Sequence, residues 1–149
     1  MEQFIIEPLK GFGEIPFGMS LDDAVKILGA PVFYEELNDI EEMDNRSIFY
    51  EYDDIATNIY FEGITKSVVA CFQTENPNAV LYENKVFALS RAEVIELMRE
   101  NGFSELEEAE EDGEYRISFE DAMIDFFFNG EKMSAVSWGV LVDDQGNII

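Results

Sequence analysis

The sequence contains no histidine and only one cysteine, Cys71. The lack of histidine excludes histidine-based catalytic triads, His-ligated zinc and acid–base chemistry by imidazole. A single cysteine excludes an internal disulfide and a metal site built from a cysteine cluster. We therefore expect no catalytic centre, no cofactor and no metal, so that the protein is not an enzyme, and we expect a reduced, cytoplasmic location.

Long apolar runs and basic residues are also scarce. No run approaches the roughly 20 apolar residues of a membrane span, and residues 1–10 lack the basic start and apolar stretch of a secretory signal. The chain has 9 Lys+Arg against 33 Asp+Glu, a formal net charge of -24. Because binding to a phosphate backbone draws on Lys and Arg, direct nucleic-acid contact is disfavoured, and a basic protein partner is favoured.

An internal repeat organises what is present. Hydrophobic residues make up 47% and aromatic residues 13% of the 149 residues, enough for one packed domain. Residues 48–72 align without a gap on residues 115–139 at an offset of 67. In this alignment Tyr52 meets Phe119 and Gly63 meets Gly130. Such self-similarity indicates a duplicated unit.

A short helix is predicted ahead of each copy of the repeat. Ser20 with Asp23 resembles a capping box, and Ser90 with Glu93 fits one fully. Apolar residues recur at helical spacing after each cap. A glycine then follows each helix, as is typical of a helix end.

The fold predicted from these signals is α+β, a tandem duplication of one helix plus a three-stranded antiparallel meander, with the helices packed on one face of the sheet. We expect one domain, 1–149, with repeats over about 12–73 and 85–142 and a linker over 74–84. The expected strands are about 47–53, 56–62, 65–73, 114–120, 122–129 and 132–142.

Alternation along these strands separates two faces. One face carries an apolar set that should pack against the helices: Tyr50, Tyr52, Thr57, Ile59, Phe61, Ile117, Phe119, Ile124, Phe126 and Phe128. The other face mixes aromatic rings with acids and amides, which is typical of interface cores. Alternatively, loops or the linker cover these rings.

Two acidic connectors, residues 35–44 and 105–114, contain 13 acids and no base. The acids are Glu35, Glu36, Asp39, Glu41, Glu42, Asp44, Glu105, Glu107, Glu108, Glu110, Glu111, Asp112 and Glu114. Each is either a residue of a solvated loop or part of a field that steers a basic partner.

The stretch from Ile15 to Pro31 reads IPFGMSLDDAVKILGAP. It resembles the opening of the β-lactamase inhibitor protein superfamily and of related small lipoproteins of outer-membrane assembly. In the second half, Arg99-Glu-Asn-Gly102 stands where that opening has its Leu-Gly-x-Pro ending. The resemblance implies a tandem-repeat inhibitor that grips a partner enzyme with an open sheet. Small acidic immunity proteins are similar in size, charge and α+β architecture. This is an analogy of fold, which does not imply function by itself.

The leading hypothesis is a non-enzymatic protein-binding module, an immunity-type inhibitor that neutralises a basic bacterial toxin or enzyme. The candidate partner-binding residues are Phe49, Glu51, Tyr60, Glu62, Asp125, Phe127, Glu107, Glu108 and Glu110. One alternative is a DNA mimic that occupies a nucleic-acid-binding protein, and another is a structural domain whose acids serve solubility. Regularly spaced carboxylates favour the mimic, whereas acids around an aromatic patch favour the inhibitor.

Overall fold

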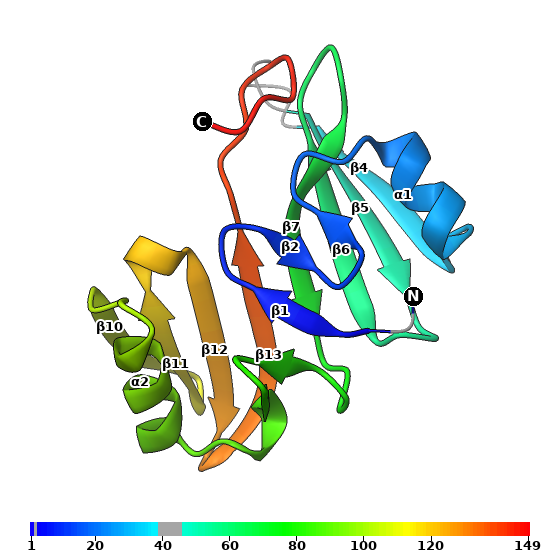
Figure 1. Cartoon of the computed structure of the whole chain (residues 1–149). Helices are drawn as coiled ribbons and strands as arrows, with labels where there is room; N and C mark the ends of the chain where they lie inside the picture. Colours follow the sequence, from blue (N-terminus) through cyan, green and yellow to red (C-terminus); the bar gives the residue numbers. More distant parts are fainter. Residues whose placement is uncertain (2, 39–45) are drawn as a thin grey trace.

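An antiparallel sheet of eight strands forms one layer of the protein (Figure 1). The computed structural model describes residue 1, residues 3–38 and residues 46–149. Two four-stranded meanders meet at the centre of the sheet, giving the order β10-β11-β12-β13-β7-β6-β5-β4. The bounds are Phe33–Asn38 for β4, Arg46–Tyr52 for β5, Thr57–Glu62 for β6, Val68–Thr74 for β7, Leu106–Glu111 for β10, Glu114–Phe119 for β11, Ile124–Asn129 for β12 and Lys132–Gly139 for β13.

One short helix precedes each meander: α1 (Leu21–Leu28) and α2 (Arg91–Glu100). The predicted caps are confirmed. The Ser20 hydroxyl accepts a hydrogen bond from the Asp23 amide, and Ser90 with Glu93 forms a complete capping box. The helices lie on the same side of the large sheet, toward its opposite ends (Figure 1).

A second sheet of very short strands covers the centre of the large sheet on that same side (Figure 1). Its order is β3-β2-β1-β8-β9, and β1 pairs with β8 in parallel. The bounds are Ile5–Glu7 for β1, Gly11–Phe12 for β2, Ile15–Pro16 for β3, Val80–Leu81 for β8 and Asn84–Lys85 for β9. Two single turns of 3-10 helix complete the described elements, η1 (Val86–Ala88) and η2 (Glu120–Ala122).

Trp138 of β13 joins the two sheets. Its side chain is 1% exposed, and its indole Nε1 donates a hydrogen bond to the carbonyl oxygen of Gly11 at 3.0 Å. The ring meets Phe12 edge-on at 5.1 Å between centroids and stacks on Phe72 at 5.4 Å. These distances are typical of favourable aromatic pairs. The centre of the core therefore lies between the large sheet and the small sheet.

The prediction of an α+β fold, in which helices form the covering layer over three strands per half, is wrong. The described residues are mostly β, with thirteen strands in two sheets and two α-helices of only eight and ten residues. The strands of the small sheet have two or three residues each, which is too short for alternation to be visible in the sequence. The segment 74–84, expected to be a linker, contains β8.

Both acidic connectors are also partly strands. Residues 33–38 form β4 and residues 106–111 form β10, the two edge strands of the large sheet. An edge strand tolerates a high density of charge because its side chains reach water easily and the charges discourage pairing with other chains. The acids Asp39, Glu41, Glu42 and Asp44 lie outside the described residues.

Several local irregularities recur at the offset of 67 residues. Ala56 and Met123 both adopt left-handed backbone, with φ of 48° and 50°. Gly63 and Gly130 both have positive φ in the next turn, as their sequence predicts. The pairing register shifts after Tyr60 in one half and after Phe127 in the other. The duplication remains a prediction, and these matches favour it.

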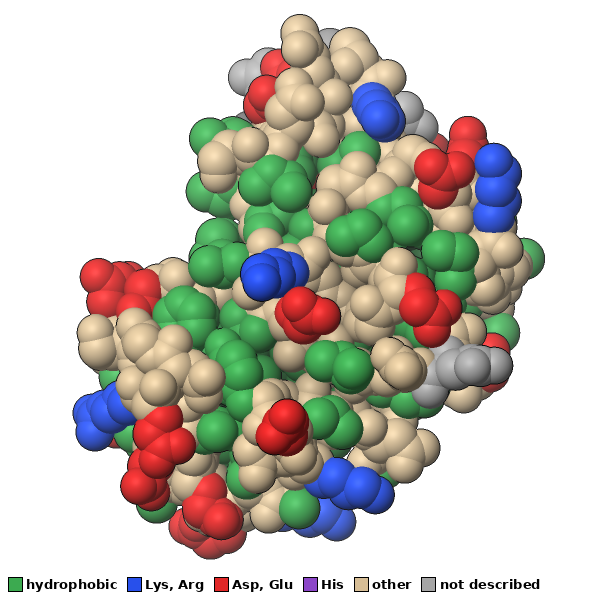
Figure 2. Space-filling model, viewed as in Figure 1, with side chains coloured by type: hydrophobic (Ala, Val, Ile, Leu, Met, Phe, Trp, Pro, Cys, Tyr) green, Lys and Arg blue, Asp and Glu red, His purple; other side chains and the backbone are tan. Residues whose placement is uncertain are grey.

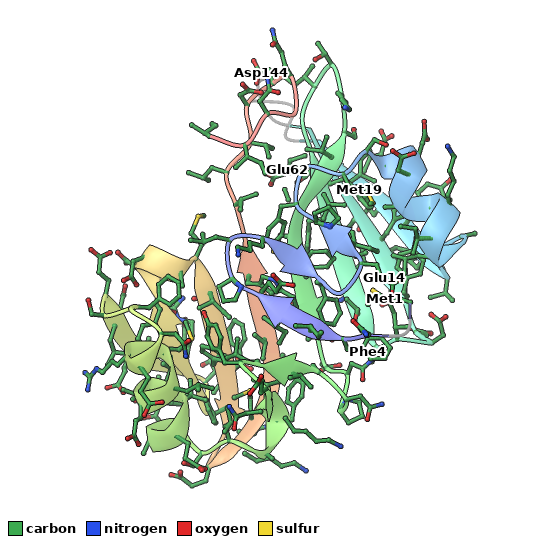
Figure 3. The ribbon with its side chains drawn as sticks, in the orientation of Figure 1. Met1, Phe4, Glu14, Met19, Glu62 and Asp144 are labelled. Atoms are coloured by element: carbon green, nitrogen blue, oxygen red, sulfur yellow. The ribbon has the colours of Figure 1, made fainter. Side chains whose placement is uncertain are left out.

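The C-terminal segment folds back beside the turn that follows β6. Figure 3 shows Asp144 at this end of the molecule, where Glu62 ends β6. The Asp144 carbonyl oxygen accepts hydrogen bonds from the amides of Ile64 and Thr65, at 2.8 and 2.9 Å. A bridge between Val142 and Ile148 closes the segment. The chain end is therefore attached to the first meander.

Candidate protein-binding face

In the part of the chain that the structure describes, a second layer covers one face of the large sheet and not the other. Along β6, Thr57, Ile59 and Phe61 are buried, and the residues between them are only half-buried. The predicted assignment of faces is confirmed, since all members of the predicted apolar set are buried except Tyr50, which is partly buried. The helices and the small sheet lie on that covered face, which is the face seen in Figure 2.

We call the opposite side the open face. It is defined by strand alternation and pairing register and includes Phe33, Glu35, Leu37, Ser47, Phe49, Glu51, Asn58, Tyr60, Glu62, Cys71, Gln73, Ser137, Asp125, Phe127, Arg116, Ser118 and Glu107. Seven of the nine predicted partner-binding residues belong to this face.

Three aromatic rings form a row on the open face, across strands β4, β5 and β6. Phe49 and Tyr60 are directly paired in the register, and their ring centroids are 5.2 Å apart. Phe33 extends the row to the edge strand, 6.2 Å from Phe49. Phe33 is exposed, with half of its surface accessible to water (50%), whereas Phe49 and Tyr60 are less accessible and only partly buried. The row is an apolar strip whose rings support one another and whose outer end is accessible to water.

Carboxylates lie on both sides of this aromatic row. Glu35 is the register partner of Phe49, and Glu51 is the register partner of Phe33. Glu62 lies two residues beyond Tyr60 on β6 and accepts a hydrogen bond from the Ser47 hydroxyl at 3.3 Å. Apolar contact area with acids at its rim suits a partner that combines apolar and basic side chains.

A polar band crosses the middle of the open face. Register pairing runs from Ser118 and Asp125 through Ser137 and Gln73 to Asn58. The Ser118 hydroxyl donates a hydrogen bond to the Asp125 carboxylate. Tyr60 lies on one side of this band, whereas Arg116 and Phe127 lie on the other side.

Cys71 also lies within this band, 3.7 Å from the Ser137 hydroxyl. Burial raises the pKa of the Cys71 thiol to about 11, and the carboxylates of Glu62 and Asp125 act in the same direction, against a lowering by the hydrogen bond with Ser137. The thiol is therefore protonated at neutral pH and is a poor nucleophile, because thiolate is the reactive form.

The second half of the open face is built differently from the first. Arg116 stands where the first half has Phe49, and it pairs with Phe127. Its Nε atom is buried and has no hydrogen-bond partner among the described residues. Phe127 lies three strands from Tyr60, about 14 Å across the sheet, and the register displaces it by four residues, roughly 13 Å, along the strand direction. The structure therefore brings Phe49 and Tyr60 together but leaves Phe127 outside their row.

The three acids predicted on the second connector point to different faces. Glu107 pairs with Ser118 and belongs to the open face, while Glu108 and Glu110 alternate to the covered side. A hydrogen bond and charge repulsion from Glu107 raise the pKa of the Glu120 carboxyl. Burial and a hydrogen bond with Glu108 raise the pKa of Tyr115. Only Glu107 of these three shares a surface with the aromatic row.

Three residues of this region were missed from the sequence. Phe33, Tyr34 and Leu37 of β4 are 50%, 66% and 42% exposed. The available signal was the two rings directly before Glu35, which an edge strand can carry but a solvated loop seldom does. Recognising it required reading the acid-rich segment as a strand.

Larger hollows in the described ranges lie along α2 and the segment before it, away from the open face. A small cavity of about 150 Å³ lies at one end of the open face, lined by polar side chains that include Glu51, Asn58 and Gln73. Among residues 1, 3–38 and 46–149, no three or more Asp, Glu or Cys side chains lie together so that they could hold a metal ion. Within the same ranges, no helix is long and apolar enough to cross a membrane.

The chain was compared with known proteins at the levels of family, sequence and fold. No protein-family model, curated protein or solved structure matches it.

Proposed function

We propose that this protein is a non-enzymatic binding module that neutralises a basic partner protein, as an immunity-type inhibitor of a toxin or enzyme does. The observation that carries the proposal is the row of Phe33, Phe49 and Tyr60 on the open face, exposed at its Phe33 end, with carboxylates beside it. Aromatic rings in a desolvated patch are the usual anchors of protein interfaces. The resemblance of Ile15–Pro31 to the β-lactamase inhibitor protein superfamily is in accord with this role.

Charge and aromatic contact have separate tasks in this proposal. The net charge of -24 attracts a basic partner and raises the rate of encounter. Burial of the rings then determines how long the complex lasts, because most affinity differences within an interface lie in the dissociation rate. Acids arranged around an aromatic row favour an inhibitor over a DNA mimic, since a mimic needs ordered carboxylates and no apolar anchor. We place the protein in the cytoplasm, where a single free thiol stays reduced.

The experiment starts from the genes on either side of the one that encodes this chain. Each neighbouring product is expressed, and its binding to the wild-type chain is measured by surface plasmon resonance. We expect a basic product that binds and whose toxicity or activity the chain suppresses. Tyr60→Ser should weaken that binding, while Glu131→Gln, a change of an exposed acid in the turn between β12 and β13, should not.

Two results would contradict the proposal. One is suppression of the partner by a chain in which Phe49 and Tyr60 are both replaced by serine, at undiminished affinity. The other is tight binding of every basic protein tested, with affinity that disappears at moderate salt, because that behaviour indicates a charged surface without a specific interface.

A further inference from the structure

The two edges of the large sheet differ in how they are protected. Four of the six residues of β10 are glutamates. Strand β4 has only Glu35 and Glu36, and its other described side chains, Phe33, Tyr34 and Leu37, are exposed apolar groups. Natural edge strands usually carry charges or irregularities that prevent further pairing. By this criterion β10 is a closed edge and β4 is an open one.

We propose that β4 accepts an extended, basic segment of the partner protein as a ninth strand of the large sheet. An edge strand presents a row of unpaired amide and carbonyl groups, and strand addition satisfies them while the side chains provide selectivity. This inference rests on the proposed binding function for the choice of a protein partner. It adds where the partner's backbone attaches and what its residues must be.

The charge of Glu35 and Glu36 determines which kind of strand can pair with β4. A segment with Lys or Arg opposite Glu35 and Glu36 forms cross-strand pairs of opposite charge, which stabilise a sheet. In a second copy of this chain, antiparallel pairing centred on these residues would place glutamate opposite glutamate, which is destabilising. Each copy also carries a net charge of -24. The edge therefore favours a basic strand over self-association.

The aromatic row continues onto this edge. Phe33 on β4 is 6.2 Å from Phe49, and on the covered side Tyr34 of β4 is 6.1 Å from Tyr50. An added strand would thus lay its apolar side chains beside Phe33 on one face and beside Tyr34 on the other. The most exposed rings of the first meander lie where such a strand would cover them.

The probe is a capped peptide, Val-Thr-Lys-Lys-Val-Thr, added to the full chain and followed by backbone amide shifts and hydrogen exchange. We expect shifts and added protection confined to β4 and β5, and no binding by the analogue with two glutamates in place of the lysines. Only alternate amides of an added strand point toward its neighbour. N-methylation of one alternating set should therefore abolish binding, and N-methylation of the other set should leave it intact.

Charge variants supply the matched control. Glu35→Lys with Glu36→Lys should weaken peptide binding by about tenfold, because two attractive pairs become repulsive. Glu111→Lys with Glu114→Lys makes the same change of charge at the other edge of the sheet, at two exposed residues that face each other on β10 and β11, and should alter binding by less than about twofold. Equal loss in both variants, or equal binding by both N-methylated peptides, would overturn the proposal.

A second copy is the remaining occupant to test. Concentration-dependent dimerisation by sedimentation, with protection of the β4 amides in the absence of peptide, would refute the basic-strand proposal. Tyr60→Ser separates this inference from the proposed function. That variant should retain peptide binding at β4, so its loss of the cognate partner reports on the open face, whereas the peptide reports on the edge alone.

Discussion

Two adjacent aromatic residues of β6 provide the sharpest test of which face of the sheet is free. Phe61 points into the core and is 0% exposed, whereas Tyr60 points to the open face and is half-buried beside Phe49. We compare Phe61→Ala with Tyr60→Ala. Both changes remove one ring at neighbouring positions of one strand, so the difference between them reports the burial of each face.

The structure gives the expected magnitudes. Removal of a fully buried phenylalanine costs about 3–5 kcal/mol of unfolding free energy, from lost burial and the cavity left behind. Tyr60→Ala loses one aromatic pair, about 0.5–1.5 kcal/mol, and a fraction of the area of a buried ring. The expected destabilisation is about 1–2 kcal/mol for Tyr60→Ala. The two variants should therefore differ by roughly 2–3 kcal/mol.

Urea denaturation measures this difference directly. Trp138 is the only tryptophan and is buried between the sheets, so its fluorescence follows loss of the core. With a urea dependence of about 1–3 kcal/mol per molar, the midpoints should differ by about 0.7–3 M. Circular dichroism on the same samples checks that both signals change together, as a two-state transition requires.

Equal destabilisation by the two substitutions would refute the reasoning. It would mean that the Tyr60 ring is as buried as the Phe61 ring, so that another part of the chain covers the open face. The aromatic row would then belong to the core and could not bind a partner without rearrangement. A third variant, Phe49→Ala, checks the result, since it should resemble Tyr60→Ala if both rings lie on a free face.

Further predictions concern the core, the thiol and the kinetics of binding. Trp138→Phe should cost about 2–3 kcal/mol of unfolding free energy by urea denaturation, because it leaves the Gly11 carbonyl oxygen without its donor and opens a small cavity. Burial raises the pKa of the Cys71 thiol from 9.0 to about 11, so the protonated thiol contributes stability that is fully present below pH 9 and is lost as the pH rises through about 11. Cys71→Ala should therefore reduce the loss of unfolding free energy between about pH 9 and pH 11. Tyr52→Phe is the matched variant, since the pKa of Tyr52 is raised to about 12 and its contribution disappears at higher pH, between about 10 and 12. With the cognate partner on a sensor surface, neutralising Glu107, Glu108 and Glu110 together should slow association at low salt and leave dissociation nearly unchanged, whereas Tyr60→Ala should accelerate dissociation. Acceleration of dissociation by the charge variant alone would make the acidic edge strand β10 the interface.

The sequence predicted the parts of the fold that have a strong local signal. The six central strands lie close to their predicted ranges, and the two helix caps have the predicted hydrogen bonds. Alternation over six or seven residues also separated the faces, placing Phe61 inside and Tyr60 outside. These signals are local because a strand face repeats every second residue and a cap spans four residues.

The missed features depend on contacts between distant segments. The small sheet joins β1 to β8 across more than seventy residues, and each strand is too short to reveal a period. The sequence predicts acidic connectors where the edge strands β4 and β10 lie, because acidic residues are so dense there. These segments become strands because they pair with β5 and β11, whose backbone amide and carbonyl groups need hydrogen-bond partners. The composition of the acidic segments alone does not predict this pairing.

The position of the acids changes what the charge of -24 can do. On solvated loops, acids contribute a field and little else, but on edge strands they also decide whether another strand can pair there. Strand β10 has four glutamates and only Leu106 and Ala109 as apolar residues, so it offers an added strand little apolar contact. Strand β4 has two glutamates between exposed rings, so it can hold a strand by apolar contact and select it by charge. The two meanders are alike in topology but have unequal edges, and this inequality favours the first meander, with its aromatic row and open edge, as the half that binds.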